Sequence, residues 1–155
     1  MSASTGSDRP DPEVMRVWSA LLVAHRRLTA SMDDELRQRG GMDLDEYDVL
    51  HQLQRGGRPM RMGELAEQVL ITRPTVTRLV GRLVDAGSVV RSDDPDDRRT
   101  VLVELSELGA SRLSEAARVH GADIARLVGD PLAGHDLAAV ADALEALARS
   151  PRDTP

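Results

Sequence analysis

The sequence predicts a mainly helical fold that contains one small β-hairpin. Three observations lead to this prediction. Apolar residues recur at helical spacing along most of the chain, a tight turn joins two short helices near its middle, and two strand-like runs follow them. Two helices joined by a tight turn and followed by a hairpin form a winged helix-turn-helix. Longer helices are predicted on both sides of this module.

The first long helix is predicted over residues 12–39, after a leader at 1–11 whose small and polar residues are expected to be disordered. Gly40 and Gly41 end this helix. Its apolar residues alternate by three and four, the spacing of a seam that packs against another helix. The seam consists of Val14, Trp18, Leu21, His25, Leu28, Met32 and Leu36.

The central module is predicted to begin with a helix over residues 44–54. Asp43 and Glu46 have the spacing of a capping box at its start. The Gly-Gly-Arg-Pro run at 56–59 breaks this helix, and a short helix follows over 62–70. Its inward residues are predicted to be Leu65, Ala66 and Val69.

The second short helix lies between Thr72, a candidate N-cap, and Gly87, a C-terminal stop. One face is apolar, and the other carries arginines and hydroxyls with no carboxylate before Asp85. The apolar face consists of Val76, Leu79, Val80, Leu83 and Val84. Arginine can bind guanine edges or phosphates, and threonine reaches phosphates and thymine methyl groups. The alternative is a solvated amphipathic helix.

Two strand-like runs follow, at residues 88–91 and 100–105, and a charged turn joins them. The turn ends in Arg98 and Arg99, and narrow minor grooves attract inserted arginines. Asp97 can hydrogen-bond Arg99 and hold its side chain extended, which lowers the ordering cost of insertion. A flexible solvated turn is the alternative, but the neighbouring helix of arginines and hydroxyls favours DNA binding.

Residues 44–109 resemble the MarR family of bacterial transcription regulators. The segments that carry the resemblance are residues 63–66, 71–80, 83–87 and 93–109. The last of these contains a proline, then Asp-x-Arg, then an alternating strand closed by Ser-Glu-x-Gly. Where the family has a hydroxyl cap before its Glu-Leu-Ala helix, this chain has Arg61, so that helix is expected to be less well capped.

The resemblance implies a homodimer that binds double-stranded DNA at a pseudo-palindromic operator and represses transcription. We predict DNA contacts from Arg73, Pro74, Thr75, Thr77, Arg78, Arg82, Arg98 and Arg99, with Asp97 supporting the wing. Arg73, Thr75, Thr77 and Arg78 are expected to face the major groove, and Arg82 is expected to contact a phosphate. Arg99, helped by Arg98, is expected to enter the flanking minor groove.

Two further helices are predicted after the hairpin, over residues 106–128 with Ser106 as N-cap and over 135–149. The apolar stripes are Leu113, Ala117, His120, Ile124, Leu127 and Val128 in the first, and Leu137, Val140, Ala141, Leu144, Leu147 and Ala148 in the second. A small module cannot bury all of these stripes, so a helical dimer interface is expected. The predicted regions are a leader (1–11), dimerisation helices (12–40 and 106–150), the DNA-binding module (43–105) and a tail (151–155).

The resemblance also implies a small aromatic or anionic effector bound between the dimer helices and the module. Candidate lining residues are Trp18, Arg26, Tyr47 and His51; simple packing is the alternative for the two aromatic residues. The four histidines show no paired i, i+4 spacing, so no metal site is expected, although a pH response through them stays open.

Composition excludes several other classes of protein. Without cysteine the chain cannot form disulfides, sense oxidation through thiols or bind metal through cysteine, and without lysine it has no Gly-Lys-Ser/Thr phosphate loop. We therefore predict no catalytic residue and no cofactor. No apolar run approaches the roughly 20 residues that span a membrane, and a signal pattern is lacking, so a cytoplasmic location is expected.

The formal net charge of −6 conceals an uneven distribution. Residues 55–100 contain nine arginines and seven acidic residues, so the basic charge is concentrated where the DNA contact is predicted. Two alternatives use the same fold without an operator: a protein-interaction module, and an architectural protein that binds DNA with little sequence preference. Arginines at 73, 78 and 99 argue against the first, and a steep salt dependence without preference would reveal the second.

Overall fold

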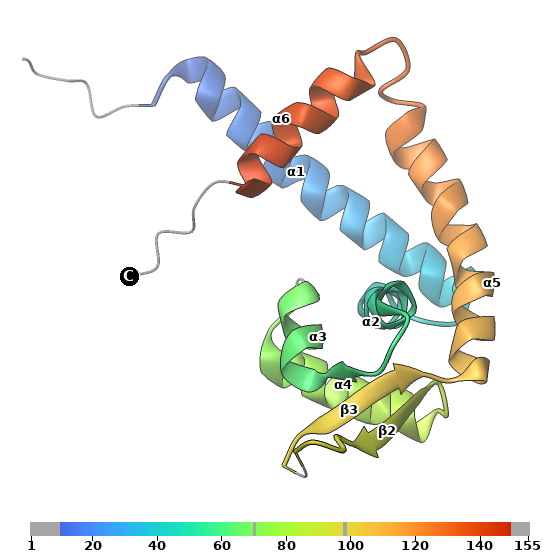
Figure 1. The fold of residues 1–155 in the computed structure, drawn as a ribbon. Helices are drawn as coiled ribbons and strands as arrows, with labels where there is room; N and C mark the ends of the chain where they lie inside the picture. The colour runs from blue at the N-terminus through green and yellow to red at the C-terminus, as the bar shows by residue number, and fades with distance from the viewer. Residues whose placement is uncertain (1–9, 70, 98, 150–155) are drawn as a thin grey trace, which may run out of the picture. The chain divides into compact units, whose positions relative to one another are not determined.

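The computed structural model describes residues 10–69, 71–97 and 99–149 (Figure 1). The elements are α1 (Pro12–Glu35), η1 (Leu36–Gly40), α2 (Leu44–Gly56), β1 (Met60–Arg61), α3 (Met62–Gln68), α4 (Arg73–Asp85), β2 (Val89–Asp93), β3 (Val101–Leu105), α5 (Glu107–Ile124), η2 (Ala125–Gly129) and α6 (Leu137–Arg149). The chain divides into two compact units, Met1–His120 and Gly121–Pro155, and each is described by itself.

The first helix begins where the sequence predicts. Asp11 caps α1, because its carboxylate accepts a hydrogen bond from the Glu13 N–H group at 2.7 Å. The predicted leader otherwise lies outside the described residues. None of the 24 described residues of α1 is buried, whereas Leu36, in the π-helical turn η1 that continues it, is fully buried. The N-terminal part of the predicted seam is exposed, with Trp18 at 53 %.

The capping box of α2 is confirmed. Asp43 Oδ1 accepts the Glu46 N–H at 2.8 Å, and Glu46 Oε2 accepts the Asp43 N–H at 3.1 Å. The helix continues to Gly56, two residues beyond the prediction. Gly57 then turns the chain with a φ of 63°, a left-handed conformation that favours glycine.

The predicted hairpin is present and is part of a larger sheet. Strands β2 and β3 pair antiparallel from Val89 opposite Leu105 to Asp93 opposite Val101. A third strand, β1, pairs with the other edge of β3, so the order is β1-β3-β2. Strand β1 was not predicted, because a strand of two residues is too short to show alternation. The predicted hairpin therefore supplies two of the three strands of a small antiparallel sheet.

The helices α3 and α4 form the predicted helix-turn-helix. Among the described atoms, no side-chain hydrogen bond caps α3 at Arg61, as the departure from the family pattern predicts. Thr72 occupies the N-cap position of α4, but its hydroxyl pairs with the Thr75 hydroxyl at 2.9 Å. The prediction that the Thr72 side chain caps the backbone is therefore wrong, since no described N–H group donates to it.

The C-terminus of α4 ends in a Schellman motif. Gly87 has a φ of 70°, its N–H donates to the Val84 carbonyl at 2.9 Å, and the Ser88 N–H donates to the Leu83 carbonyl at 2.8 Å. The chain can then turn directly into β2. The predicted stop at glycine is confirmed.

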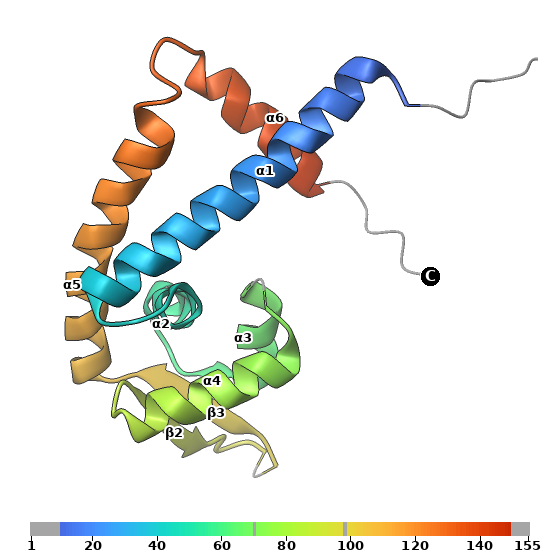
Figure 2. The same cartoon turned by 180° about the vertical axis from the view of Figure 1, so that it is seen from behind.

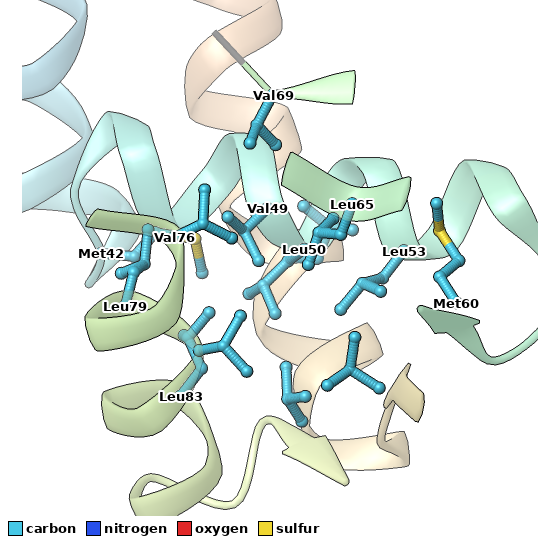
Figure 3. Packing of buried hydrophobic residues seen from close by; sticks show 14 of the residues in the cluster. Met42, Val49, Leu50, Leu53, Met60, Leu65, Val69, Val76, Leu79 and Leu83 are labelled. Carbon is cyan, nitrogen blue, oxygen red and sulfur yellow. The ribbon is translucent and has the colours of Figure 1, made fainter. Parts of the chain in front are cut away.

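The apolar face of α4 packs into the core of the module. Val76, Leu79, Val80 and Leu83 are buried, as predicted, while Val84 lies half-buried at the edge. Figure 3 shows three of these residues beside Val49, Leu50 and Leu53 of α2 and Leu65 of α3. Burial of this stripe fixes the rotation of α4, so its opposite face must point to solvent.

The next helix, α5, begins at the predicted cap, because Ser106 Oγ accepts the Gly109 N–H at 2.9 Å. Its inward residues are Leu113 and Ala116, with Val119 partly buried. Ala117, on the predicted apolar stripe, is exposed, and its place in a dimer interface stays a prediction. Figure 2 shows this part of the fold from behind.

The second unit contains the last helix, α6. It starts two residues later than predicted, and Asp136 accepts the Ala139 N–H at 3.1 Å near its start. Its 13 described residues include no buried one, and Leu137, Leu144 and Leu147 are about half exposed. Across the described part of the chain, no helix is both long enough and apolar enough to cross a membrane.

Candidate nucleic-acid interface

The exposed face of α4 presents most of the predicted DNA contacts. Arg73, Pro74, Thr77, Arg78 and Arg82 are exposed, and Thr75 is half-buried. All six belong to one helix whose opposite face is anchored in the core. The fold therefore gathers these side chains onto a single rigid surface, as the spacing predicted.

Intrahelical hydrogen bonds orient two hydroxyls on this face. Thr77 Oγ1 donates to the Arg73 carbonyl at 3.1 Å, and the Thr75 hydroxyl pairs with that of Thr72. Such bonds select one side-chain rotamer, so less freedom is lost when a partner binds. Both hydroxyls keep capacity to accept a further hydrogen bond.

The three arginines of α4 differ in their surroundings. Arg73 Nη2 lies 3.2 Å from Glu67 Oε1 in a pair in which both side chains are highly exposed, so water and salt weaken it. Arg78 makes no ion pair with any described residue, and it lines a groove of about 420 Å³ with Asp45, Thr75, Leu79 and Arg82. An anion that approaches Arg78 breaks no ion pair of this arginine among the described residues, although the Asp45 carboxylate lines the same groove.

Arg82 is held differently from the prediction of a simple phosphate contact. Its Nη2 atom lies 3.6 Å from Asp43 Oδ2 and 3.9 Å from Glu46 Oε1. Both carboxylates belong to the start of α2. In the free protein Arg82 therefore joins α4 to α2, and its phosphate contact stays a prediction.

The wing tip is organised around Asp97. Its carboxylate accepts the backbone N–H of Arg99 at 3.0 Å and the Thr100 hydroxyl at 2.9 Å. The predicted bond from Asp97 to the Arg99 side chain is thus replaced by one to its backbone. Arg99 is exposed and makes no ion pair with the described residues, while Arg98 lies outside them.

An ion pair between Arg61 and Asp94, here called the clamp, lies at the base of the wing and was not predicted from the sequence. Asp94 is only 5 % exposed, and its Oδ2 accepts hydrogen bonds from Arg61 Nε at 3.0 Å and Nη2 at 2.8 Å. Its Oδ1 accepts the Asp96 N–H at 2.9 Å. The two partners of the ion pair lie 33 residues apart. Only the pairing of β1 with β3 brings them together, so no local pattern could reveal the clamp.

The clamp predicts a pH-dependent stability. The Asp96 N–H, and then Arg61, hold the pKa of Asp94 below its ordinary value of 3.8. A lowered folded-state pKa stabilises the protein above the unfolded-state value, and this contribution disappears as the pH falls through the folded-state pKa. We expect Asp94→Asn to lower the melting temperature at pH 7, with a smaller effect at pH 3.

Circular dichroism at the two pH values measures this effect. Asp96→Asn is the matched control, because it removes the same charge from an exposed neighbour. An equal loss of melting temperature at pH 7 and pH 3 would show that the Asp94 charge is not responsible.

Two of the four candidate effector residues lie together. The Tyr47 and His51 rings are stacked, with centroids 5.9 Å apart and planes at 7°, and His120 contacts Tyr47 at 4.5 Å. His120 was predicted only as part of an apolar stripe. No ring contact or hydrogen bond within the described residues joins Trp18 or Arg26 to Tyr47. Burial, and then Asp48, raise the pKa of Tyr47, so its phenol is neutral at pH 7.

Comparisons of the sequence and of the structure with known proteins point to the same family. A sequence model of the MarR family matches residues 40–100, from the end of η1 to the wing. YkoM of Bacillus subtilis, an uncharacterized HTH-type transcriptional regulator, is 27 % identical over 118 residues, which cover 75 % of this chain and 76 % of that protein.

Two crystal structures of MarR family transcriptional regulators from Streptomyces coelicolor are also similar. Sco3205, in complex with DNA, gives a TM-score of 0.82 at 28 % identity, over 90 % of this chain and 92 % of that one. AbsC gives 0.81 at 26 % identity, over 92 % and 96 % of the two chains. Both similarities extend beyond the central module to the flanking helices.

Proposed function

The chain belongs to the MarR family of DNA-binding transcriptional regulators, and we propose that it is a repressor that binds an inverted-repeat operator as a homodimer. The observation that carries this proposal is the exposed face of α4, with Arg73 and Arg78 beside oriented threonine hydroxyls. Sco3205, a similar protein, has been crystallised in complex with DNA.

Helix α4 has suitable dimensions for the major groove. Its 13 residues give it a length of roughly 20 Å, and the groove is about 12 Å wide. In this proposal Arg73 and Arg78 bind base edges, because a guanidinium can form two hydrogen bonds with guanine. Thr75 and Thr77 contact phosphates or thymine methyl groups, and Pro74 packs against the DNA backbone.

The wing supplies the minor-groove contact in this proposal. Arg99 enters the groove, helped by Arg98, because narrow minor grooves concentrate negative potential. Asp97 supports the insertion by fixing the Arg99 backbone, and the pair of Arg61 with Asp94 fixes the strand below it. Less conformational freedom is then lost on binding.

Exposed apolar side chains support the homodimer. Trp18 and Val17 of α1 are more than half exposed, as are Leu137 and Leu147 of α6. Large apolar side chains that are exposed on both helices are typical of surfaces that associate with a partner. A two-fold dimer would place its two α4 helices about 34–36 Å apart, in successive major grooves, and would therefore read an inverted repeat.

The Tyr47 and His51 rings support an effector site. We infer that a small aromatic anion stacks on them, with Trp18 as a further ring and Arg26 as the partner of its charge. Tyr47 is half-buried and His51 exposed, so one end of the stack is open. Such a ligand releases DNA only if it binds the DNA-free arrangement of the protein more tightly than the DNA-bound one.

Replacement of Arg78 tests base reading. Arg78→Ala should weaken binding to the operator by about 1–3 kcal/mol and relax the preference at one base pair of each half-site. Fluorescence anisotropy measures both the affinity and the base preference. The probes are the DNA upstream of the protein's own gene and single-base-pair variants of that DNA.

Arg39→Ala is the matched control, because Arg39 is exposed and paired with Glu35 at the end of α1. It should leave the base preference unchanged. If both variants lose the same affinity for every duplex, Arg78 contributes only charge, and the base-reading role is wrong.

A further inference from the structure

We propose that two carboxylates at the start of α2, those of Asp43 and Glu46, compete with DNA phosphate for Arg82 and thereby limit the affinity of the protein for DNA. The inference rests on the proposed binding of α4 to DNA. It assigns these acidic residues a regulatory role in addition to their role in starting a helix.

The two carboxylates are largely enclosed, whereas the arginine is exposed to solvent. The side chains of Asp43 and Glu46 are 10 % and 17 % exposed, whereas that of Arg82 is 62 % exposed. The separations of 3.6 and 3.9 Å are those of an ion pair without a close hydrogen bond. Such a pair is weak in water, so Arg82 can leave it for another anion.

The capping box dictates where the two negative charges lie. Asp43 uses Oδ1 and Glu46 uses Oε2 to accept backbone N–H groups at the start of α2. The second oxygen of each carboxylate, Oδ2 and Oε1, is the one nearest Arg82. Neither carboxylate can turn away from Arg82 without weakening the helix start, so the competing charge is a permanent feature of the fold.

A second arginine makes the exchange feasible. Arg37 Nη2 lies 3.5 Å from the same Asp43 Oδ2 atom, and Arg37 Nε is bonded to Asp33 at 2.8 Å. Asp43 therefore keeps a positive neighbour when Arg82 turns to a phosphate. This neighbour also reduces the repulsion between the Asp43 carboxylate and the approaching DNA.

The competition predicts that removal of a carboxylate and removal of the arginine have opposite effects on DNA affinity. Removal of either negative charge should tighten binding to every DNA sequence alike, because phosphates carry no sequence information. Removal of Arg82 should weaken binding, and it should also abolish any gain from removing the carboxylates. This dependence on Arg82 separates a direct pair from a general change in net charge.

Asp43→Asn and Glu46→Gln are suitable variants, because asparagine and glutamine keep the capping acceptors. Fluorescence anisotropy with a random-sequence duplex at low salt measures phosphate binding without knowledge of the operator. Each variant should bind about two- to fivefold more tightly than wild type. Arg82→Ala should lower the slope of log K against log salt by about 0.9. In the Arg82→Ala background neither variant should tighten binding.

Asp34→Asn is the charge-matched control, since Asp34 is exposed and makes no ion pair with the described residues. Thermal unfolding of each variant checks the capping of α2. Unchanged affinity, or equal tightening by Asp34→Asn or in the Arg82→Ala background, overturns the inference.

The proposed function is tested separately by the wild-type preference for upstream DNA over a shuffled duplex. If that preference is missing while Asp43→Asn still tightens random-duplex binding through Arg82, the operator proposal fails and the competition stands. Absence of any duplex binding at low salt overturns both.

Discussion

Gly109→Ala is expected to lower the free energy of unfolding by about 3 kcal/mol or more. A Cβ atom at this position would lie 2.0 Å from the Ser88 carbonyl oxygen and 2.9 Å from Leu105 Cδ1. The carbonyl cannot move freely, because it accepts the Ser106 N–H at 3.1 Å, and the buried Ser88 hydroxyl accepts Arg112 Nη1 at 2.6 Å. Relief of the clash would break the junction between β2 and α5.

Urea denaturation followed by circular dichroism measures this loss. Gly63→Ala is the matched control, since Gly63 also lies in the first turn of a helix and a Cβ there meets no described atom within 4 Å. That variant should change stability by no more than about 1 kcal/mol, in the stabilising direction. Equal destabilisation by both substitutions would show that the approach of Ser88 to Gly109 is not the cause.

Leu144→Asp is expected to abolish the proposed homodimer and to weaken binding to the proposed operator at least a hundredfold. Leu144 is 49 % exposed and lies on the apolar stripe of α6, between Leu137 and Leu147. In a two-fold interface the substitution would bury two carboxylates without partners, at a cost of several kcal/mol. Each winged module would then bind its half-site alone, so the gain from simultaneous binding would be lost.

Light scattering coupled to size-exclusion chromatography gives the oligomeric state, and anisotropy gives the affinity. Ala139→Asp adds the same charge on the opposite side of α6 and should leave the dimer intact. A Leu144→Asp protein that remains dimeric would place the interface elsewhere.

The parts of the fold that the sequence predicts correctly depend on neighbours within one helical turn. The capping box of Asp43 and Glu46, the Ser106 cap and the buried stripe of α4 all follow from spacings of three or four residues. Such patterns reflect local hydrogen bonding and the period of the helix, and both can be recognised from residues that are close together in the chain. The spacing did not identify the buried Ala116, because two adjacent small residues, Ala116 and Ala117, fit one stripe equally well.

The parts that the sequence does not reveal depend on contacts between distant residues. The pair of Arg61 with Asp94 exists only because β1 joins the sheet, and Arg82 meets Asp43 only because α4 packs on α2. The sequence also does not show which of several possible hydrogen bonds a side chain in a turn forms. The Thr72 hydroxyl, for example, pairs with the Thr75 hydroxyl. The sequence therefore identifies the residues of the candidate interface, while the structure supplies their partners.

We propose above that the exposed faces of α4 and the wing recognise a DNA sequence. An anisotropy titration at near-physiological salt tests this directly. The probe is the DNA upstream of the protein's own gene, and the competitor is a shuffled duplex. We predict a preference of a hundredfold or more, about 2.7 kcal/mol, for the upstream DNA. Equal and weak binding to both duplexes, unchanged by Arg78→Ala, would contradict the claim and favour a protein partner for the arginine-lined surface.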